Sequence, residues 1–193
     1  MVQTVFSDVP YYGETPNYEV QTPSRWSVAD DGTDLHWFLN TSDYRGQVNF
    51  GLGEYALVDQ HTYGDFSIQL DARINEDLSS NPQADYALLF AFEDAENYAY
   101  VAMRNDDGAT RLYQMVDGSR IEVATANLSG LADSTYHDVV LTRIGSTVAV
   151  NVDGTDILWA SDPALTAMGQ VGVGSFNDSV YFDNINVTDP IVS

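Results

Sequence analysis

Apolar and polar residues alternate with a period of two along most of the chain, and turn-forming residues separate the alternating segments. In residues 65–74, apolar side chains occupy every second position, while Gln69, Asp71 and Arg73 occupy positions between them. Successive side chains of a β-strand point to opposite faces, so this pattern predicts a strand that buries one face. Many short strands of this kind are typical of an antiparallel sandwich or barrel.

Other segments extend this all-β prediction. Residues 139–152 are predicted as a hairpin, and the Asp-Gly turn at the start of residues 153–159 leads from it into a further strand. Residues 171–176 and 180–187 are predicted as a final pair of strands. Helix is scarce, because only residues 162–168 predict a helical turn, with an aspartate as N-cap and proline at the first helical position.

Three acidic residues, Glu93, Asp94 and Glu96, lie between two aromatic-rich apolar segments. Paired carboxylates of a glycan-cleaving enzyme must face each other across the scissile bond, and on a single strand they need alternate positions. Enzymes of this kind carry acids spaced E-x-D-x-x-E or E-x-D-x-E on one strand, whereas these three are spaced E-D-x-E. The alternation on either side of them also breaks where they lie. We therefore predict that they form the bend between two strands.

The length of 193 residues suits one sizeable hydrophobic core. We predict a single domain, residues 1–193, in which the turn-rich residues 1–25 wrap an edge of the sandwich. Trp26, Trp37 and Trp159 are predicted to pack in the core. No apolar run is long enough to span a membrane, and the first residues lack the pattern of a signal peptide.

The charge is strongly negative, with 29 acidic residues against 7 basic ones and a net charge of −22. All the basic residues are arginine, and the chain contains neither lysine nor cysteine. Such a surface repels nucleic acid and anionic lipid, so we expect no nucleic-acid partner and no membrane insertion. The lysine-free acidity is typical of proteins adapted to high salt, and calcium ligation by aspartate is a second explanation that adds to the first.

Four blocks of sequence, at residues 63–73, 85–101, 136–155 and 169–187, resemble in order and spacing the laminin-G-like, concanavalin A-like jelly-roll domains. The resemblance covers Trp26 to Val187. It implies an all-β fold, a two-sheet antiparallel jelly-roll β-sandwich of about twelve to fourteen strands. Such domains accompany polysaccharide-degrading enzymes or surface glycan-binding proteins. The resemblance therefore implies an extracellular or cell-surface location and a polysaccharide or oligosaccharide partner.

Glycan usually lies on one sheet face of such domains, so the side chains that point away from the core are candidates. Tyrosine rings stack on sugars, and arginine binds carboxylate or sulfate in a bidentate manner, which would make the ligand an acidic polysaccharide. The alternative is that these arginines pair with acids on a solvated sheet. The candidate ligand-binding residues, all expected on one face, are Gln69, Arg73, Tyr98, Tyr100, Arg104, Arg111 and Tyr113.

Catalysis has weaker support in the sequence. A jelly-roll lyase needs a tyrosine or histidine base and a neutraliser for the uronate carboxylate, and His61 with Tyr63, Gln69 and Arg73 could supply such a set. The motifs of alginate-lyase-like jelly rolls are absent, however, and we assign no catalytic residue. We predict a non-catalytic carbohydrate-binding module or lectin-like domain; a polysaccharide lyase or glycoside hydrolase, and a structural adhesion or assembly domain, are the alternatives.

Asp183 falls between apolar residues of the last predicted strand, where a carboxylate is costly unless it is ligated or hydrogen-bonded. Jelly-roll carbohydrate modules often hold a structural calcium ion between the final strand and the N-terminal segment. The resemblance thus implies calcium as a structural cofactor, with Asp8 and Asp183 as its ligands. The alternative is that Asp183 accepts hydrogen bonds from the protein itself.

Overall fold

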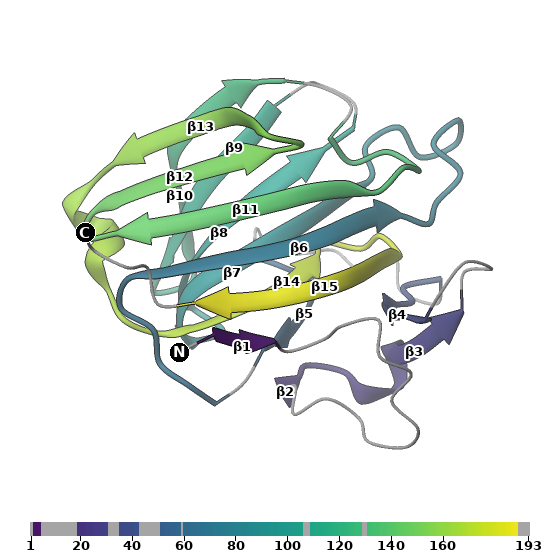
Figure 1. Ribbon diagram of the computed structural model, residues 1–193, viewed down its shortest axis with the longest axis horizontal. Helices are drawn as coiled ribbons and strands as arrows, with labels where there is room; N and C mark the ends of the chain where they lie inside the picture. The colour runs from purple at the N-terminus through teal and green to yellow at the C-terminus, as the bar shows by residue number, and fades with distance from the viewer. Residues whose placement is uncertain are drawn as a thin grey trace.

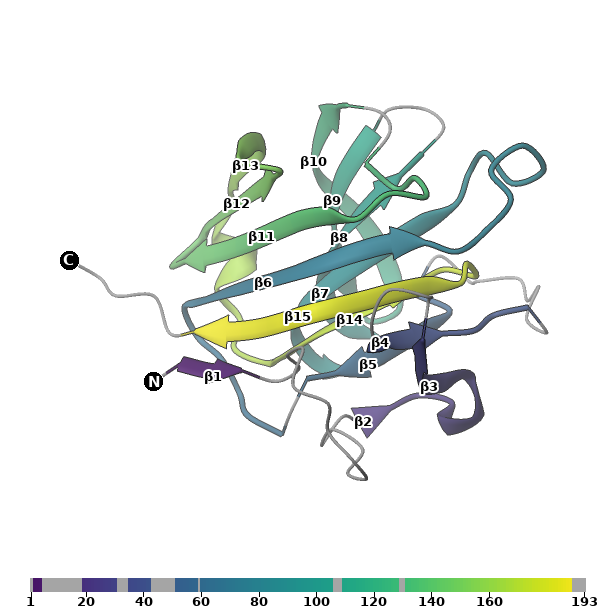
Figure 2. The same ribbon diagram turned by 45° about the vertical axis from the view of Figure 1, so that its right-hand side comes forward.

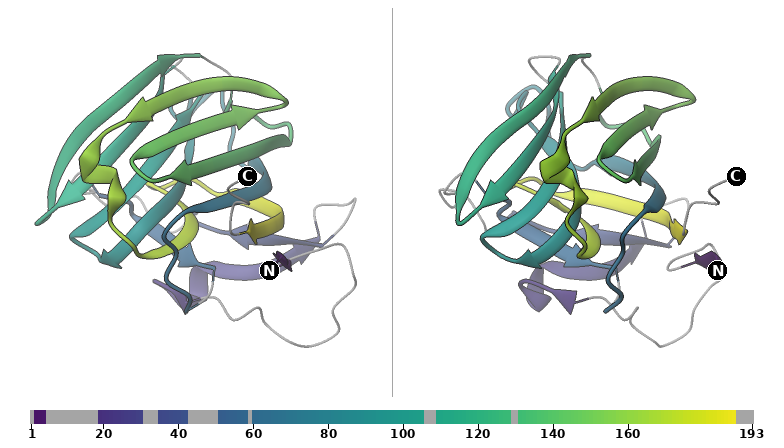
Figure 3. Two further views of the ribbon diagram at one scale, coloured as in Figure 1. Left: turned by 60° about the vertical axis from the view of Figure 1, so that its left-hand side comes forward. Right: turned by 90° about the vertical axis from the view of Figure 1, so that its left-hand side faces the viewer.

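Two antiparallel β-sheets packed face to face form the described part of the chain (Figure 1). The computed structural model describes residues 2–4, 19–30, 35–42, 51–58, 60–105, 109–128 and 131–188. A view from the side separates the two layers (Figure 3). The predicted all-β, two-sheet antiparallel sandwich is confirmed.

Sheet A has eight strands. From one edge to the other they are β13 (Thr155–Ser161), β12 (Thr147–Val152), β11 (His137–Ile144), β6 (Phe66–Ile74), β15 (Val180–Thr188), β4 (Leu35–Leu39) and β3 (Trp26–Asp30). The eighth strand, β1 (Val2–Thr4), pairs with the end of β15, and Figure 2 shows the two side by side.

Sheet B has seven strands. In spatial order they are β10 (Ser119–Asn127), β9 (Ala109–Val116), β8 (Asn97–Arg104), β7 (Asp85–Asp94), β14 (Gln170–Ser175), β5 (Glu54–Leu57) and β2 (Glu19–Val20). Two short 3₁₀ turns, η1 (Pro23–Arg25) and η2 (Pro163–Thr166), complete the described elements. The strands outnumber the prediction because β1 and β2, of 3 and 2 residues, are too short to carry a periodic signal.

The alternation in β6 builds one side of the core. Five apolar residues of this strand are buried and belong to the cluster between the sheets: Phe66, Ile68, Leu70, Ala72 and Ile74. Burying each large apolar side chain contributes about 1.5–3 kcal/mol to stability. The strand predicted at residues 65–74 and its buried face are therefore confirmed.

The three tryptophans have different fates. Trp26 and Trp37 are buried and stack with ring centroids 5.6 Å apart. The prediction for Trp159 is wrong, because its side chain is 70% exposed. It lies between the buried Leu158 and Ala160 on the edge strand β13, so the alternation points it outward.

Arg143 carries a charge into the core, on the same face of β11 as Val139 and Leu141, and its side chain is only 1% exposed. Burial lowers the pKa of its guanidinium group. The group donates hydrogen bonds to the carbonyl oxygens of Tyr63, Gly64, Leu165 and Ala167. Because these carbonyls come from the loop before β6 and from the η2 region, the arginine ties both segments to sheet A. The helical turn predicted there is confirmed, with Asp162 accepting a hydrogen bond from the Ala164 amide.

The bend predicted at the three acids is also confirmed. Glu93 and Asp94 end β7, Glu96 lies in the turn before β8, and all three are exposed. Asp94 accepts hydrogen bonds from the Glu96 amide at 2.8 Å and from the Asn97 side chain, and these bonds lower the pKa of Asp94. This carboxylate therefore stabilises the turn instead of facing a second carboxylate across a cleft.

The strands predicted as a final pair do not pair with each other. β14 lies in sheet B between β7 and β5, whereas β15 lies in sheet A between β6 and β4. The residues between them pass from one layer to the other. β14 is almost continuously buried, and so are the first four residues of β15, so the pattern there gives no signal of which sheet each strand joins.

Residues 1–25 were predicted to wrap an edge of the sandwich, and residues 2–4 and 19–25 are described. β2 pairs with β5 at the edge of sheet B, while β1 pairs with β15. Arg25 forms an ion pair with the buried Glu54, which also accepts a hydrogen bond from Thr22 at 2.7 Å. These contacts fix the end of the segment to sheet B. The assignment of the whole chain to a single domain stays a prediction.

Candidate functional site

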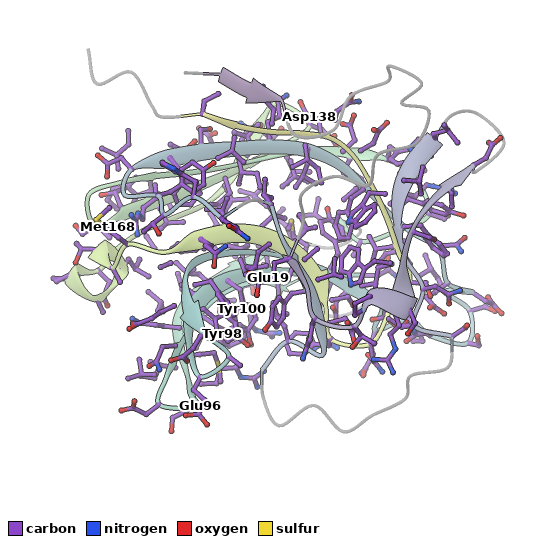
Figure 4. The ribbon with its side chains drawn as sticks, turned by 90° about the horizontal axis from the view of Figure 1, so that it is seen from below. Glu19, Glu96, Tyr98, Tyr100, Asp138 and Met168 are labelled. Atoms are coloured by element: carbon purple, nitrogen blue, oxygen red, sulfur yellow. The ribbon has the colours of Figure 1, made fainter. Side chains whose placement is uncertain are left out.

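The residues predicted to bind ligand are divided between two opposite faces of the molecule. Those on β6 belong to sheet A, and those on β8 and β9 belong to sheet B. In Figure 4, Asp138 lies on the opposite side of the molecule from Tyr98 and Tyr100; its carboxylate accepts a 3.0 Å hydrogen bond from Gln69. The expectation of one shared face is therefore wrong for Gln69 and Arg73. Both sheets have an outer face, and alternation alone does not tell one from the other.

On the outer face of sheet A, Arg73 is part of a packed arrangement. Its guanidinium carbon lies 4.6 Å from the ring centroid of Tyr181 and 5.1 Å from that of Tyr136. Tyr181 in turn stacks on Phe38 at 4.4 Å. Such cation–π contacts stabilise the fold by about 0.5–2 kcal/mol each. They hold Arg73 against Tyr181 of the neighbouring strand β15 and Tyr136, which precedes β11.

Asp183 lies on the same outer face and is buried. One of its oxygens is 3.2 Å from Nδ1 of His36, and the other accepts a hydrogen bond from the Asn184 amide at 2.8 Å. Protein groups thus contact both oxygens of this carboxylate. The other predicted calcium ligand, Asp8, lies outside the described residues, and those residues contain no group of three or more metal-binding side chains. Calcium at Asp8 and Asp183 stays a prediction.

The outer face of sheet B carries a second apolar cluster, separate from the core between the sheets. Tyr98 and Tyr100 belong to it and are buried, together with Leu52, Leu89 and further apolar residues. The amide of Leu52 donates a 2.9 Å hydrogen bond to the hydroxyl of Tyr98, so the segment before β5 covers this ring. Tyr98 and Tyr100 therefore support the face from below, and the half-buried Tyr55, Tyr113 and Phe176 present its accessible rings.

Two of these rings, those of Tyr113 and Phe176, line a hollow of about 70 Å³, which we call the arginine hollow. Its sides come from three consecutive strands, β8, β9 and β10, and from the residue that follows β14. Two of its lining residues are alanines, whose small side chains leave space among the larger ones. One of them, Ala102, pairs with Arg111 on the neighbouring strand. The lining residues are Ala102, Arg104, Ala109, Arg111, Tyr113, Arg120 and Phe176.

Aromatic and charged neighbours position the arginines of the hollow. The guanidinium carbon of Arg120 lies 4.6 Å from the ring centroid of Tyr113. Nε of Arg111 lies 3.8 Å from a carboxylate oxygen of the exposed Glu122. Burial raises the pKa of Tyr100, and the adjacent Arg120 opposes that rise. Arg104 and Arg111, both predicted from the sequence, thus meet at one site with Tyr113.

Arg120 was missed in the sequence, for an identifiable reason. β10 is exposed over most of its length and therefore has no apolar alternation. The available signal was the turn before it, because Asp117 and Gly118 both have positive φ, at 49° and 73°, as a type I′ hairpin requires. That turn pairs Arg120 with Met115, and the Tyr113 ring lies on the same face of β9.

Two buried carboxylates lie next to the arginine hollow. Asp85 is the cross-strand partner of Arg104 and accepts hydrogen bonds from the Ser175 hydroxyl and the Phe176 amide, both at 3.0 Å. Asp178 accepts hydrogen bonds from Asn81 and from the Asp85 amide. Burial, followed by repulsion from Asp178, raises the pKa of Asp85 to about 7. Both carboxylates are at most 5% exposed, and both accept hydrogen bonds from other groups of the protein.

The set proposed for a lyase is not brought together. Tyr63 lies just before the start of β6 and its ring contacts that of His61, at a centroid distance of 4.6 Å. Arg73 lies near the other end of β6, which places it about 20 Å away at the rise of an extended strand.

No helix among the described residues is long and apolar enough to cross a membrane.

Comparison with solved structures gives the same fold. The structure is similar to the carbohydrate-binding module CBM66 from Bacillus subtilis, with a TM-score of 0.67 and 15% identity over 89% of this chain and 96% of the other. It is also similar to sheep galectin-11, with a TM-score of 0.52 and 9% identity over 67% of this chain and 97% of the other. The GH43 protein BlXynB from Bacillus licheniformis has a TM-score of 0.63 and 10% identity, but only 39% of its chain is covered, against 96% of this one.

No family model and no curated protein matches the sequence. The structural similarities establish the fold: the chain is a concanavalin A-like jelly-roll sandwich, as its sequence predicted.

Proposed function

We propose that the protein is a non-catalytic carbohydrate-binding domain that holds a polysaccharide or oligosaccharide on the outer face of sheet B. The observation that carries the proposal is that the arginines of the hollow share its lining with the accessible rings of Tyr113 and Phe176. Aromatic rings stack on sugar faces, and arginine side chains donate hydrogen bonds that fix the orientation of the ligand. In this proposal the domain acts outside the cell or at its surface, where polysaccharides are met.

The similar structures support this class of function. One of them is itself a carbohydrate-binding module, and this chain covers nearly all of it. The similarity to BlXynB covers a minor part of that protein, and similarity of fold alone does not separate binding from hydrolysis. The three acids of the β7–β8 turn are exposed at the end of sheet B, and Asp85 and Asp178 are buried in hydrogen bonds to the protein. These observations favour binding over cleavage.

The test is a glycan array, followed by calorimetry on the glycans that bind, with and without calcium. We expect saturable binding and no release of reducing ends or unsaturated uronate products. Turnover of a bound glycan would replace this proposal with a lyase or hydrolase. Absence of binding to every glycan would favour a structural adhesion or assembly domain.

A further inference from the structure

The arginines of this protein are few, and their grouping is uneven. The chain has seven arginines, no lysine and 29 acidic residues. Three of the seven, Arg104, Arg111 and Arg120, line one hollow. Three positive charges around one space attract an anion locally, within a protein that is acidic overall. The arrangement therefore points to an anion as part of what this hollow holds.

Glu122 and Asp85 are acidic neighbours of two of these arginines. Glu122 is exposed and lies 3.8 Å from Arg111, and a surface ion pair of this kind contributes little. Asp85 lies opposite Arg104 on the neighbouring strand, and one of its carboxylate oxygens accepts hydrogen bonds from Ser175 and Phe176. Neither carboxylate lines the hollow.

The hollow, with a volume of about 70 Å³, is lined by three guanidinium groups. It has room for a carboxylate or a sulfate group. Guanidinium groups bind both anions through paired, charge-assisted hydrogen bonds. The sugar that carries the anion would then lie outside the hollow, against the ring of Tyr113.

We propose that the arginine hollow is an anion subsite, which binds the carboxylate of a uronate or the sulfate ester of a sulfated sugar. The inference rests on the proposed function and adds to it the chemical class of the ligand. The net charge of −22 repels a polyanion at long range, whereas the arginines attract it at short range. Salt screens the long-range repulsion first, so affinity for an acidic glycan should hold or rise at moderate salt.

The test uses glycans that differ only in charge. Oligogalacturonate is compared with its carboxyl-reduced form, and a sulfated galactan oligosaccharide with its desulfated form, by calorimetry. We expect the charged member of at least one pair to bind about tenfold or more tightly than its neutral counterpart. Preference in only one pair would identify the anion as carboxylate or sulfate.

Arg111→Gln and Arg120→Gln remove the charge and leave a shorter, neutral polar side chain. Each should weaken the charged glycan about tenfold while changing binding of the neutral one less than twofold. Arg73→Gln on the opposite face is the matched control and should leave both affinities unchanged. Thermal melting of each variant shows that a loss of binding is not a loss of folding.

Two results would overturn the inference. One is equal affinity for charged and neutral members of both pairs, with neutral glycans still bound, which would leave the proposed function intact. The other is unchanged binding of the charged glycan by Arg111→Gln and Arg120→Gln together. A parent protein that binds no glycan of any kind on the array would remove both the proposed function and the subsite.

Discussion

The outer faces of the two sheets carry similar residues, but these residues make different contacts on each face. On sheet A, Arg73 lies between the rings of Tyr136 and Tyr181, and Asp183 contacts His36. On sheet B, Arg104, Arg111 and Arg120 surround a hollow with Tyr113 on its wall. Arginine and tyrosine next to each other therefore do not identify a binding site. On sheet B, the arginines and Tyr113 line a space, and two alanines are part of its lining.

The largest difference between the faces should appear when one tyrosine is removed from each. Tyr181→Ala deletes a buried ring that stacks on Phe38 and Arg73, and it should lower the free energy of unfolding by about 3 kcal/mol. Tyr113→Ala should cost less stability but weaken neutral and acidic glycans alike, by about tenfold. Denaturant unfolding and calorimetry measure the two effects. Weaker glycan binding by a folded Tyr181→Ala protein would contradict the assignment of the two faces.

The buried carboxylates give the next contrast. An unfolded aspartate has a pKa of about 3.9, whereas the pKa of Asp85 is raised to about 7, so the folded state binds the extra proton. Asp85 therefore favours folding below about pH 4, and that contribution is lost as the pH rises through 7. Asp85→Asn should raise the stability at pH 8 by about 2 kcal/mol relative to the parent, and flatten this part of the pH profile.

Asp183→Asn is the matched change on sheet A. It weakens a contact with His36 and should lower the stability by about 1–3 kcal/mol. Acidic glycans should bind to Asp85→Asn at least as tightly as to the parent, because a negative charge next to Arg104 is removed. Unfolding curves measured from pH 4 to 8 test the stability changes expected for Asp85→Asn and Asp183→Asn. A stability profile of Asp85→Asn parallel to that of the parent would show that Asp85 is not protonated in the folded state.

Salt should act on the whole molecule and to a smaller extent. With a net charge of −22, compaction brings like charges together, so we expect the melting temperature to be lowest at low ionic strength and to rise by several degrees with added sodium chloride. Calorimetric scans from low to molar salt measure the change. A flat melting temperature would remove the interpretation of the acidity as an adaptation to high salt.

Calcium should have the smallest effect. If Asp8 and Asp183 ligate it, calcium should add a saturable rise in melting temperature beyond that of an equal ionic strength of sodium chloride. Asp8→Asn should abolish the increment while leaving glycan binding on sheet B intact. An increment that survives Asp8→Asn would place the ion elsewhere.

Much of the fold could be predicted because alternation is a local signal. The sequence pattern predicted both the five buried positions of β6 and the acidic turn after β7. The separation of β14 from β15 could not be predicted, since β14 and the first half of β15 are buried on both faces and nothing local specifies the sheet that each one joins. The site was predicted in part for the same reason. Alternation predicts that Arg73 and Arg104 both point away from the core. Their surroundings depend on tertiary packing, which places Arg73 against Tyr136 and Tyr181 and places Arg104 at the arginine hollow.

The central claim is that glycan binds to the outer face of sheet B. Amide chemical shifts of the ¹⁵N-labelled protein, recorded while the tightest-binding glycan of the array is titrated, map that surface. We expect the shifts to change along β8, β9 and the start of β10, and at Phe176, while β6 and β15 stay unchanged. Changes confined to β6, β11 and β15 would place the site on sheet A and contradict the account.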